Sequence, residues 1–412
     1  MRQRLLAALA AALCAACTAI AQPAAPAADH RAIVEAAARS RYVLLGESTH
    51  GTHEYYLERA RITEALIRDH DVRAVAIEGD WSGAERLNRY VRGEGSDAKA
   101  AQALSGFDEF PVWMWRNEAF RDFAERLRAI NLQRPPQARV GVYGLDVYDM
   151  FDAADAVTAY LAGTDPVVAE RVRRHYRCLA RFRRSGERYA RAIAQGARSC
   201  KAGAEAALGE VRALPPASSA EAEARFAILR AAATVVGGEE YFRVQVSTGY
   251  SWNARDRRMA EGARQVAAHV GGKAVIWAHN THVGDARETS MRERGELSLG
   301  QLLRDDGGAF LVGFLTAGGH VLAADAWDRP PRVHVLKPAL QGSHEAILAA
   351  QGERQVRIAP PSSHAPRRLQ RAVGVVYAPR SERQSHYMEA RLDRQFDAVV
   401  FIRETRALTP LR

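Results

Sequence analysis

Residues 42–79 have the sequence YVLLGESTHGTHEYYLERARITEALIRDHDVRAVAIEG, and this stretch decides the fold class. The short apolar runs at 42–47 and 72–79 have the β-rich composition of buried strands. Residues 54–70 between them have the apolar spacing of a helix. A strand, a helix and a second strand in this order predict a βαβ unit, whose two strands are parallel and whose helix covers the sheet.

The same alternation continues on the carboxyl side of this unit. Amphipathic helices are predicted at 117–133, before Pro135, and at 255–270, before Gly271. Further strands are predicted at 138–146, 273–279, 309–316, 373–379 and 396–405. Together these elements predict an α/β fold with a three-layer core and a largely parallel sheet.

Two stretches interrupt the strand and helix pattern. Residues 151–248 are rich in Ala, Arg and Glu with few β-branched residues, which predicts an inserted helical bundle. Residues 318–372 are rich in Pro, Gly and His, which predicts a small, irregular α+β elaboration. The predicted segments are a signal peptide at 1–21, an α/β core at 22–150, the helical insertion at 151–248, a second part of the core at 249–317, the elaboration at 318–372 and C-terminal core strands at 373–412.

The composition of the 412 residues is that of a globular protein, with 47% hydrophobic and 26% charged residues. It excludes disordered, collagen-like and coiled-coil classes. The 58 Lys and Arg residues against 48 Asp and Glu give a net charge of +10, but these cations are mostly Arg and are spread among acidic residues. Since no basic run is interleaved with aromatic residues, a nucleic-acid partner is not expected.

The N-terminus has the pattern of a secretory signal. Arg2 and Arg4 precede the apolar run LLAALAAALCAACTAIA (5–21), which ends in Ala19-Ile20-Ala21. This pattern predicts cleavage after Ala21 and a periplasmic or secreted protein. The alternatives are an uncleaved membrane anchor and a lipoprotein signal at Cys14 or Cys17. No other apolar run approaches eighteen residues, so no stable membrane insertion is expected after cleavage.

Cys178 and Cys200 are the only cysteines that follow the predicted signal. In an oxidising compartment such a lone pair predicts a disulfide. The alternative is two buried, reduced cysteines, because the residues between them are predicted to form helices.

Ionisable side chains follow several predicted strands. Glu47 and His50 follow the first strand, Glu78 ends the second, Asp146 ends the third and His279 ends the fourth. Because ligands bind at the carboxyl ends of parallel strands, these side chains are expected to form one cleft. Histidines and carboxylates together can activate a water molecule or hold a divalent metal.

The usual hydrolase and nucleotide motifs are absent from the sequence. No G-x-S-x-G, H-E-x-x-H, G-x-x-x-x-G-K-[ST] or G-x-G-x-x-G is present. This absence disfavours a nucleophilic serine of the α/β-hydrolase type, a zincin and a nucleotide cofactor.

Five segments together resemble the erythromycin esterase family. They are LLGESTHGTHEYY, AIEGDWSGAERLNRYVRG, FPVWMWRN, SWNARDRRMA and AVIWAHNTHVGD, and the resemblance continues to the C-terminal FDAVVFIRETRALTPL. It implies a three-layer α/β fold with an inserted helical bundle. It also implies hydrolysis of a small-molecule ester, such as a macrolide lactone, by water that a histidine activates, without a cofactor.

The resemblance assigns a role to individual residues. His50 matches the general base and Glu47 its acidic partner, while Arg59 matches an arginine that stabilises a developing oxyanion. Arg61 lies close enough to be the alternative to Arg59. The residues implied as catalytic are Glu47, His50, Arg59, Glu78 and His279.

Further residues are expected to contact the substrate or to support the cleft. The expected substrate-binding residues are His53, Trp81, Trp113, Trp115, Asp146 and His282. Trp252 is a further candidate for the wall of an apolar pocket. Arg255 and Asp256 are expected to form an internal salt bridge that fixes the helix after Trp252.

Two other functions remain open at this point. The first is a metal-dependent hydrolase with an open water position, whose ligands would be Glu47, His50, Glu78, Asp146 and His279. The second is a binding protein that keeps the fold and holds a ligand without turnover, because fold and function separate easily. Retention of the whole Glu and His set favours catalysis, and no metal is expected.

Overall fold

The computed structural model describes residues 28–411 except 183, 219–220, 248–249, 353 and 359–365. The predicted signal peptide and its cleavage site lie outside the described residues. Within the described part of the chain the central sheet has eight strands, in the order β3-β2-β4-β1-β5-β10-β7, with β6 paired to β5. These strands are β1 (Tyr42–Leu45), β2 (Val72–Ile77), β3 (Gly141–Gly144), β4 (Lys273–Trp277), β5 (Ala309–Ala324), β6 (Pro331–Leu336), β7 (Arg354–Ile358) and β10 (Ala398–Thr405).

The sheet is largely parallel, which confirms the predicted fold class. The strand pairs from β3 through β2, β4, β1 and β5 to β10 all run in the same direction. Only β6 and β7 pair antiparallel to their neighbours. The carboxyl ends of β1, β2, β3 and β4 therefore lie at one edge of the sheet, where parallel α/β folds bind ligands.

Helices cover both faces of the sheet. In β1, Val43 and Leu45 pack on one side while Tyr42 and Leu44 pack on the other, because successive strand residues point to opposite faces. The helices that pack on the first side are α1 (Ala28–Ala37), α2 (His53–Asp69), α3 (Trp81–Val91), α4 (Ala100–Leu104) and α5 (Glu118–Leu132). Those on the second side include α11 (Ser251–His269) and α13 (Leu299–Asp305). The result is the expected three-layer core.

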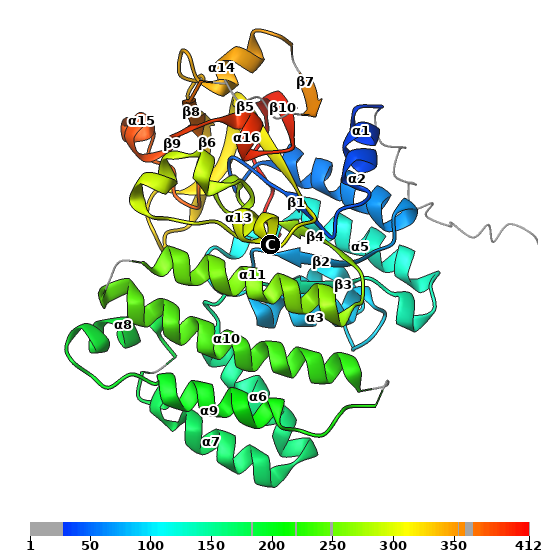
Figure 1. Cartoon of the computed structure of the whole chain (residues 1–412), viewed down its shortest axis with the longest axis vertical. Helices are drawn as coiled ribbons and strands as arrows, with labels where there is room; N and C mark the ends of the chain where they lie inside the picture. The colour runs from blue at the N-terminus through cyan, green and yellow to red at the C-terminus, as the bar shows by residue number, and fades with distance from the viewer. Residues whose placement is uncertain are drawn as a thin grey trace, which may run out of the picture.

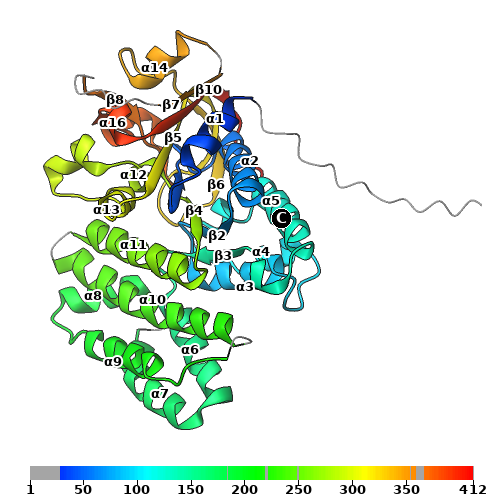
Figure 2. The same cartoon turned by 45° about the vertical axis from the view of Figure 1, so that its right-hand side comes forward.

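The long interruption of the sheet is a helical bundle with a hydrophobic core of its own. Its helices are α6 (Met150–Thr164), α7 (Pro166–Ala180), α8 (Gly186–Ala194), α9 (Lys201–Arg212) and α10 (Ala222–Ser247). Helix α10 is central, since it contacts α6, α8 and α9 on the bundle side and α11 on the sheet side. Figures 1 and 2 show the bundle at the lower end of the molecule, with α11 between it and the sheet.

The chain after β5 forms the upper part of the molecule in Figure 1. It includes a small second sheet that pairs β8 (Arg368–Arg371) with β9 (Tyr387–Ala390). The remaining short helices of the described chain are α12 (Asn280–Val283), α14 (His344–Ala349), α15 (Glu382–Ser385) and α16 (Leu392–Gln395), with 3₁₀ turns at Val112–Met114, Pro136–Ala138, Ala286–Glu288, Ser290–Arg294 and Pro379–Ser381.

The strand predicted at 373–379 is wrong. Val373 forms a single bridge with Thr49, in the loop after β1, and Val376 forms another with Ala324, at the end of β5. The segment thus pairs with two different partners in turn, and neither pairing extends into a ladder. Its apolar residues are buried or half-buried because the segment crosses the end of the sheet and walls the cavity described below.

The predicted disulfide is confirmed. Cys178, near the end of α7, is bonded to Cys200, which precedes α9, and the two Cα atoms lie 5.7 Å apart. The bond therefore ties two helices of the bundle together across 22 residues of sequence.

Removing this bond should destabilise the bundle. Closing a loop of this length stabilises a fold by about 3 kcal/mol in the chain-entropy model, so Cys200→Ser should lower the free energy of unfolding by that order. Urea denaturation of oxidised protein and the variant measures the difference. Thiol labelling of denatured, unreduced wild type should find no free thiol, and two free thiols would contradict the pairing.

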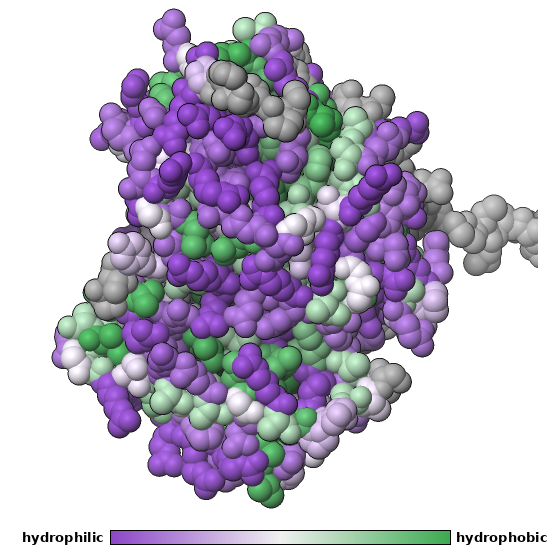
Figure 3. All heavy atoms as spheres, in the orientation of Figure 1, coloured by the Kyte–Doolittle hydropathy of each residue, from purple (hydrophilic) through white to green (hydrophobic). Residues whose placement is uncertain are grey.

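No helix in the described residues is long and apolar enough to cross a membrane. The face of the molecule seen in Figure 3 is mostly hydrophilic, and its hydrophobic side chains lie in small separate patches.

Candidate active site

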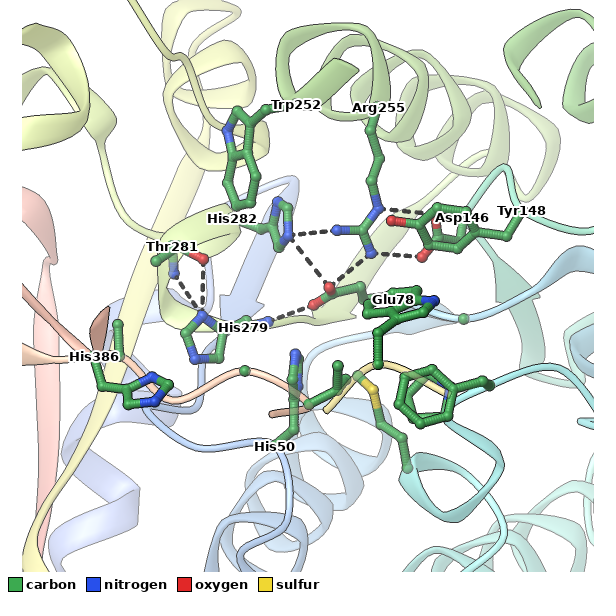
Figure 4. A pocket seen from close by; sticks show the side chains of 18 of the residues that line it. His50, Glu78, Asp146, Tyr148, Trp252, Arg255, His279, Thr281, His282 and His386 are labelled. Atoms are coloured by element: carbon green, nitrogen blue, oxygen red, sulfur yellow. Dashed lines mark hydrogen bonds and ion pairs between the residues drawn. The ribbon is translucent and has the colours of Figure 1, made fainter. Parts of the chain in front are cut away.

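A cavity of about 510 Å³ opens at the carboxyl edge of the parallel strands. Glu78, Asp146 and His279 follow β2, β3 and β4, and all three line this cavity, as does His50 in the loop after β1. Figure 4 shows their side chains converging from different segments of the chain. The sheet therefore brings together the residues whose convergence the sequence predicts.

The loop between β1 and α2 positions His50. Its Nδ1 lies 2.8 Å from Oε1 of Glu47, and Nη2 of Arg59 lies 2.8 Å from the other oxygen of the same carboxylate. Because the carboxylate can only accept, the imidazole Nδ1 carries the proton and donates it. In the neutral ring the lone pair is then on Nε2, the nitrogen that Glu47 leaves free. The arrangement suits a general base.

Glu47 and Arg59 support His50 from the buried core rather than from the cavity. Both side chains are 0% exposed, and neither lines the cavity. The guanidinium of Arg59 also lies over the rings of Tyr56 and Trp277, with its Cζ 4.4 and 4.9 Å from their centroids. Arg59 is thus held in the core, where it fixes Glu47. The expectation that Arg59 stabilises an oxyanion is wrong for this geometry, since its guanidinium does not reach the cavity.

The alternative arginine does not reach the cavity either. Arg61 does not line the cavity; its side chain is 40% exposed and pairs with Glu58 at 2.9 Å.

His279 lies against His50, with ring centroids 4.8 Å apart. Its Nδ1 accepts hydrogen bonds from the hydroxyl and the backbone N–H of Thr281, at 2.8 and 3.3 Å. Burial, followed by the nearby His50, lowers the pKa of His279 well below its usual range. The ring is therefore neutral and carries its proton on Nε2, which has no well-aligned hydrogen-bond partner in the described part of the chain. This nitrogen is buried and lies close to the backbone of Ser48 and the ring of His50.

Arg255, on α11, is the central cation of the site. It donates from Nε and Nη2 to the two oxygens of Asp146, at 2.9 and 2.6 Å, and from Nη2 to Oε1 of Glu78, at 2.8 Å. Its Cζ lies 5.1 Å from the centroid of the Tyr148 ring. Figure 4 shows this guanidinium reaching from α11 toward the sheet edge. A paired, bidentate arginine of this kind holds two buried carboxylates in place.

The predicted Arg255–Asp256 salt bridge is wrong. Consecutive helix residues point in different directions, so the two side chains do not face each other. Asp256 instead accepts from Nδ1 of His282 at 2.9 Å and from the backbone N–H of Leu299 at 2.7 Å. Both residues thus support the site through different partners: Arg255 through Asp146 and Glu78, and Asp256 through His282.

His282 is a second cation of this cluster. Burial lowers its pKa, but the carboxylates of Asp256 and Glu78 outweigh burial and raise the pKa to about 9. The protonated ring then donates from Nδ1 to Asp256 and from Nε2 toward Oε1 of Glu78, at 3.2 Å. Nη1 of Arg255 also lies 2.8 Å from Nε2. The three carboxylates of Glu78, Asp146 and Asp256 balance this close approach of two cations.

Glu78 has no free oxygen for base catalysis. Its second oxygen, Oε2, accepts the backbone N–H of His279 at 2.7 Å, while Oε1 faces Arg255 and His282. Burial raises the pKa of Glu78, but His282 and Arg255 overcome this effect and lower the pKa well below its usual range. Glu78 is therefore an ionised positioning residue that fixes His279.

The expected substrate-binding residues divide into two groups. Asp146, Trp115 and His282 line the cavity, and so does Trp252, whose ring stacks on His282 with centroids 4.2 Å apart. His53, Trp81 and Trp113 do not line it. His53 begins α2, and Trp81 packs into the bundle core. Trp113, in the 3₁₀ turn Val112–Met114, is buried in the main core, where a large aromatic side chain buries much apolar area.

The outer part of the cavity is broad and apolar. Its large hydrophobic lining residues are Phe107, Phe110, Met114, Trp115, Tyr148, Trp252, Met291, Trp327, Tyr387 and Met388. They come from the chain between α4 and α5, the loop after β3, α11, the 3₁₀ turn Ser290–Arg294 and the chain after β5. This apolar wall suits a bulky substrate, and the cluster of histidines, carboxylates and Arg255 faces its reactive polar group. Asp80, Glu109, Arg294 and Glu296 are further charged residues of the lining.

Comparison with known proteins adds to this geometry. The family model for erythromycin esterase matches residues 67–405, a span that includes Glu78, Arg255 and His279 and begins after His50. A solved succinoglycan biosynthesis protein is 18% identical, with a TM-score of 0.77 over 94% of each chain. A protein from Bacillus cereus is also 18% identical, with a TM-score of 0.73 over 92% of each chain.

A histidine-to-asparagine mutant of the erythromycin esterase EreC, in its open conformation, is a third similar structure. It is 20% identical, with a TM-score of 0.60, and the match covers 91% of this chain and 93% of that one. At these identities the solved structures support the shared fold. Because the family model spans well over half of the sequence, the chain belongs to the erythromycin esterase family.

Proposed function

We propose that the protein hydrolyses a carboxylic ester by activating a water molecule with His50. The observation that carries this proposal is the chain of contacts from Arg59 through Glu47 to Nδ1 of His50, which leaves Nε2 as the basic nitrogen. A water bound at Nε2 loses its proton to the imidazole as its oxygen attacks the ester carbonyl carbon. Glu47 stabilises the imidazolium that results.

His279 supplies the complementary donor. Attack by water turns the carbonyl oxygen into an oxyanion, and a preorganised N–H directed at that oxygen lowers the barrier. The neutral ring of His279 offers such an N–H on Nε2 beside His50. Proton return from His50 to the leaving alkoxide then releases an alcohol and a carboxylic acid, so no nucleophilic side chain and no cofactor enters the scheme.

The apolar wall of the cavity favours a bulky ester, and membership of the family makes a macrolide lactone the first candidate. Incubation of purified protein with a panel of macrolides and simple aryl and alkyl esters tests the proposal. Mass spectrometry should detect the addition of one water to a macrolide or to another bulky ester. Absence of hydrolysis across the panel, with the ligands still bound, would favour the binding-protein alternative.

The metal-dependent alternative finds less support. The oxygens of Glu78 and Asp146 already accept from Arg255, His282 and the backbone of His279, and a metal would have to displace these donors. In the part of the chain that the structure describes, no three His, Cys, Asp or Glu side chains form a group suited to a metal ion.

We also propose that the protein is exported and begins at Gln22 after signal cleavage. The support is the basic start, the apolar run and the Ala19-Ile20-Ala21 site, together with the disulfide, which persists in oxidising compartments. N-terminal sequencing of periplasmic material checks this proposal, and an intact Met1 in a membrane fraction would contradict it.

A further inference from the structure

The outer helices of the bundle carry most of the net positive charge of the chain. Helices α7, α8 and α9 and the turns between them, residues 166–212, contain twelve Arg and Lys residues against four Asp and Glu, a net charge of +8 out of +10 for the whole sequence. In the rest of the chain, cations and carboxylates nearly balance. Figures 1 and 2 show α7 and α9 at the lower end of the molecule, on the side of the bundle that faces away from the sheet.

Seven exposed arginines of this region form no ion pair with a described side chain. The disulfide and a hydrogen bond keep two of the segments that carry them together: Cys178 is bonded to Cys200, and the guanidinium of Arg181 donates to the carbonyl of Arg198 at 2.9 Å. The charge there is therefore concentrated and is not neutralised by neighbouring carboxylates. The seven residues are Arg174, Arg177, Arg181, Arg188, Arg191, Arg198 and Arg212.

A groove of about 530 Å³ lies between α6 and α7, within this basic region. Buried apolar and aromatic side chains form its floor, and exposed guanidinium groups form its rim. The floor residues are Phe151, Ala154, Tyr176 and Leu179, and the rim residues are Arg173, Arg174, Arg177 and Arg184.

Two carboxylates also line the α6–α7 groove, but both are already paired. Glu170 pairs with Arg173, and Asp155 pairs with Arg184. Arg174 and Arg177 lie three residues apart on α7, so their side chains are neighbours on the helix surface. These two arginines are therefore available to bind an anion at the rim.

This combination of groups fits the phosphate of a lipid. Guanidinium groups match phosphate geometry, and an apolar floor can take up the hydrocarbon next to the headgroup. The two aromatic residues of the floor, Phe151 and Tyr176, are only 9% and 7% exposed, so they offer no open ring on which the bases of a nucleic acid can stack. An anionic leaflet attracts basic residues within about 8 Å, the Debye length at physiological ionic strength, and exposed arginines at the end of the molecule can approach that closely.

We propose that the α6–α7 groove and the arginines around it dock the protein on a membrane surface that contains anionic phospholipids, with a lipid phosphate bound by Arg174 and Arg177. In the described part of the chain no residue lines both this groove and the main cavity. The docking site is therefore separate from the candidate active site, and it does not depend on the proposed hydrolysis.

Sedimentation of the purified protein with lipid vesicles tests the docking site. Vesicles of phosphatidylcholine with about one-third phosphatidylglycerol should bind the protein at least about tenfold more tightly than phosphatidylcholine alone, and added salt should reduce this preference. In Arg174→Gln/Arg177→Gln, binding to the anionic vesicles should weaken about 25-fold, because one arginine near an anionic surface contributes about fivefold. All variants should have the same N-terminus, so that residues 1–21 contribute equally.

The matched control is Arg39→Gln/Arg68→Gln. It removes the same charge from two exposed arginines, one just after α1 and one on α2, which Figures 1 and 2 show away from the bundle. This control should bind the anionic vesicles as wild type does, and thermal melting should show that both double variants are folded. Equal binding to the two kinds of vesicle, or equal weakening in the two double variants, would overturn the docking site. Tighter binding to a single-stranded oligonucleotide than to the anionic vesicles would also overturn it, because the arginines would then serve a nucleic acid.

Discussion

Replacing His50 by alanine is expected to lower kcat by about 10²–10⁴-fold, the usual cost of losing a general base. One nitrogen of the imidazole is held by the carboxylate of Glu47, which the buried Arg59 holds in turn, and the other nitrogen is left as the base. Its removal leaves water to attack without a proton acceptor. Steady-state kinetics on the best ester of the panel measures the change, and circular dichroism with thermal melting checks that the variant is folded.

The control for His50 lies one turn further along the chain. His53 begins α2 and does not line the cavity, so His53→Ala should change kcat only a few-fold. Dialysis against a chelator should leave the wild-type rate unchanged. If chelation abolishes turnover and a divalent ion restores it, His50 is a ligand and the general-base mechanism is wrong. A His50→Ala variant that retains kcat within tenfold would contradict the mechanism as well.

The sequence predicts the core of the fold because its signals there are local. The apolar runs at β1, β2 and β4 are short and flanked by helices with clear periodicity, so a parallel sheet follows from simple rules. The convergence of Glu78, Asp146 and His279 on the cavity follows from the same rules, since each of them comes just after a parallel strand.

The wrong predictions concern residues whose surroundings are formed by distant parts of the chain. Arg255 is next to Asp256 in sequence, but its partners Asp146 and Glu78 are more than 100 residues away. Nothing local in the segment SWNARDRRMA distinguishes a site arginine from a surface arginine. The resemblance assigns Arg59 a role in the cavity, but that role depends on how deeply α2 packs, and the packing places the guanidinium behind Glu47 rather than in the cavity.

The predictions for segment 373–379 and for some of the tryptophans are wrong for a related reason. VGVVYAP has the composition of a strand, but its two ends bridge different partners, so its residues wall the cavity instead of extending the sheet. Trp81 and Trp115 are both expected from the sequence to contact the substrate. Only packing decides that Trp115 faces the cavity, donating its indole N–H to the carbonyl of Glu78 at 3.0 Å, while Trp81 joins the bundle core.

Replacing Arg255 by methionine is expected to cost about 3–5 kcal/mol of unfolding free energy, the typical penalty for removing one partner of a buried ion pair. Methionine fills similar space but leaves Glu78 and Asp146 buried with His282 as the remaining nearby cation. Activity should fall too, because Glu78 fixes the backbone of His279. Urea denaturation at neutral pH measures the stability, and kcat on the same samples measures the second effect.

The matched control is Arg258→Met on the same helix. Arg258 pairs with Glu240 and Glu261 at the surface, with a side chain 30% exposed, so its loss should cost about 1 kcal/mol or less. Adding Asp146→Asn to Arg255→Met should recover part of the lost stability, because it removes the buried charge that loses its arginine partner. The two sites should therefore be coupled in a double-mutant cycle. Equal costs for the two arginines, without coupling to Asp146, would mean that water rather than Arg255 neutralises the carboxylates at the sheet edge.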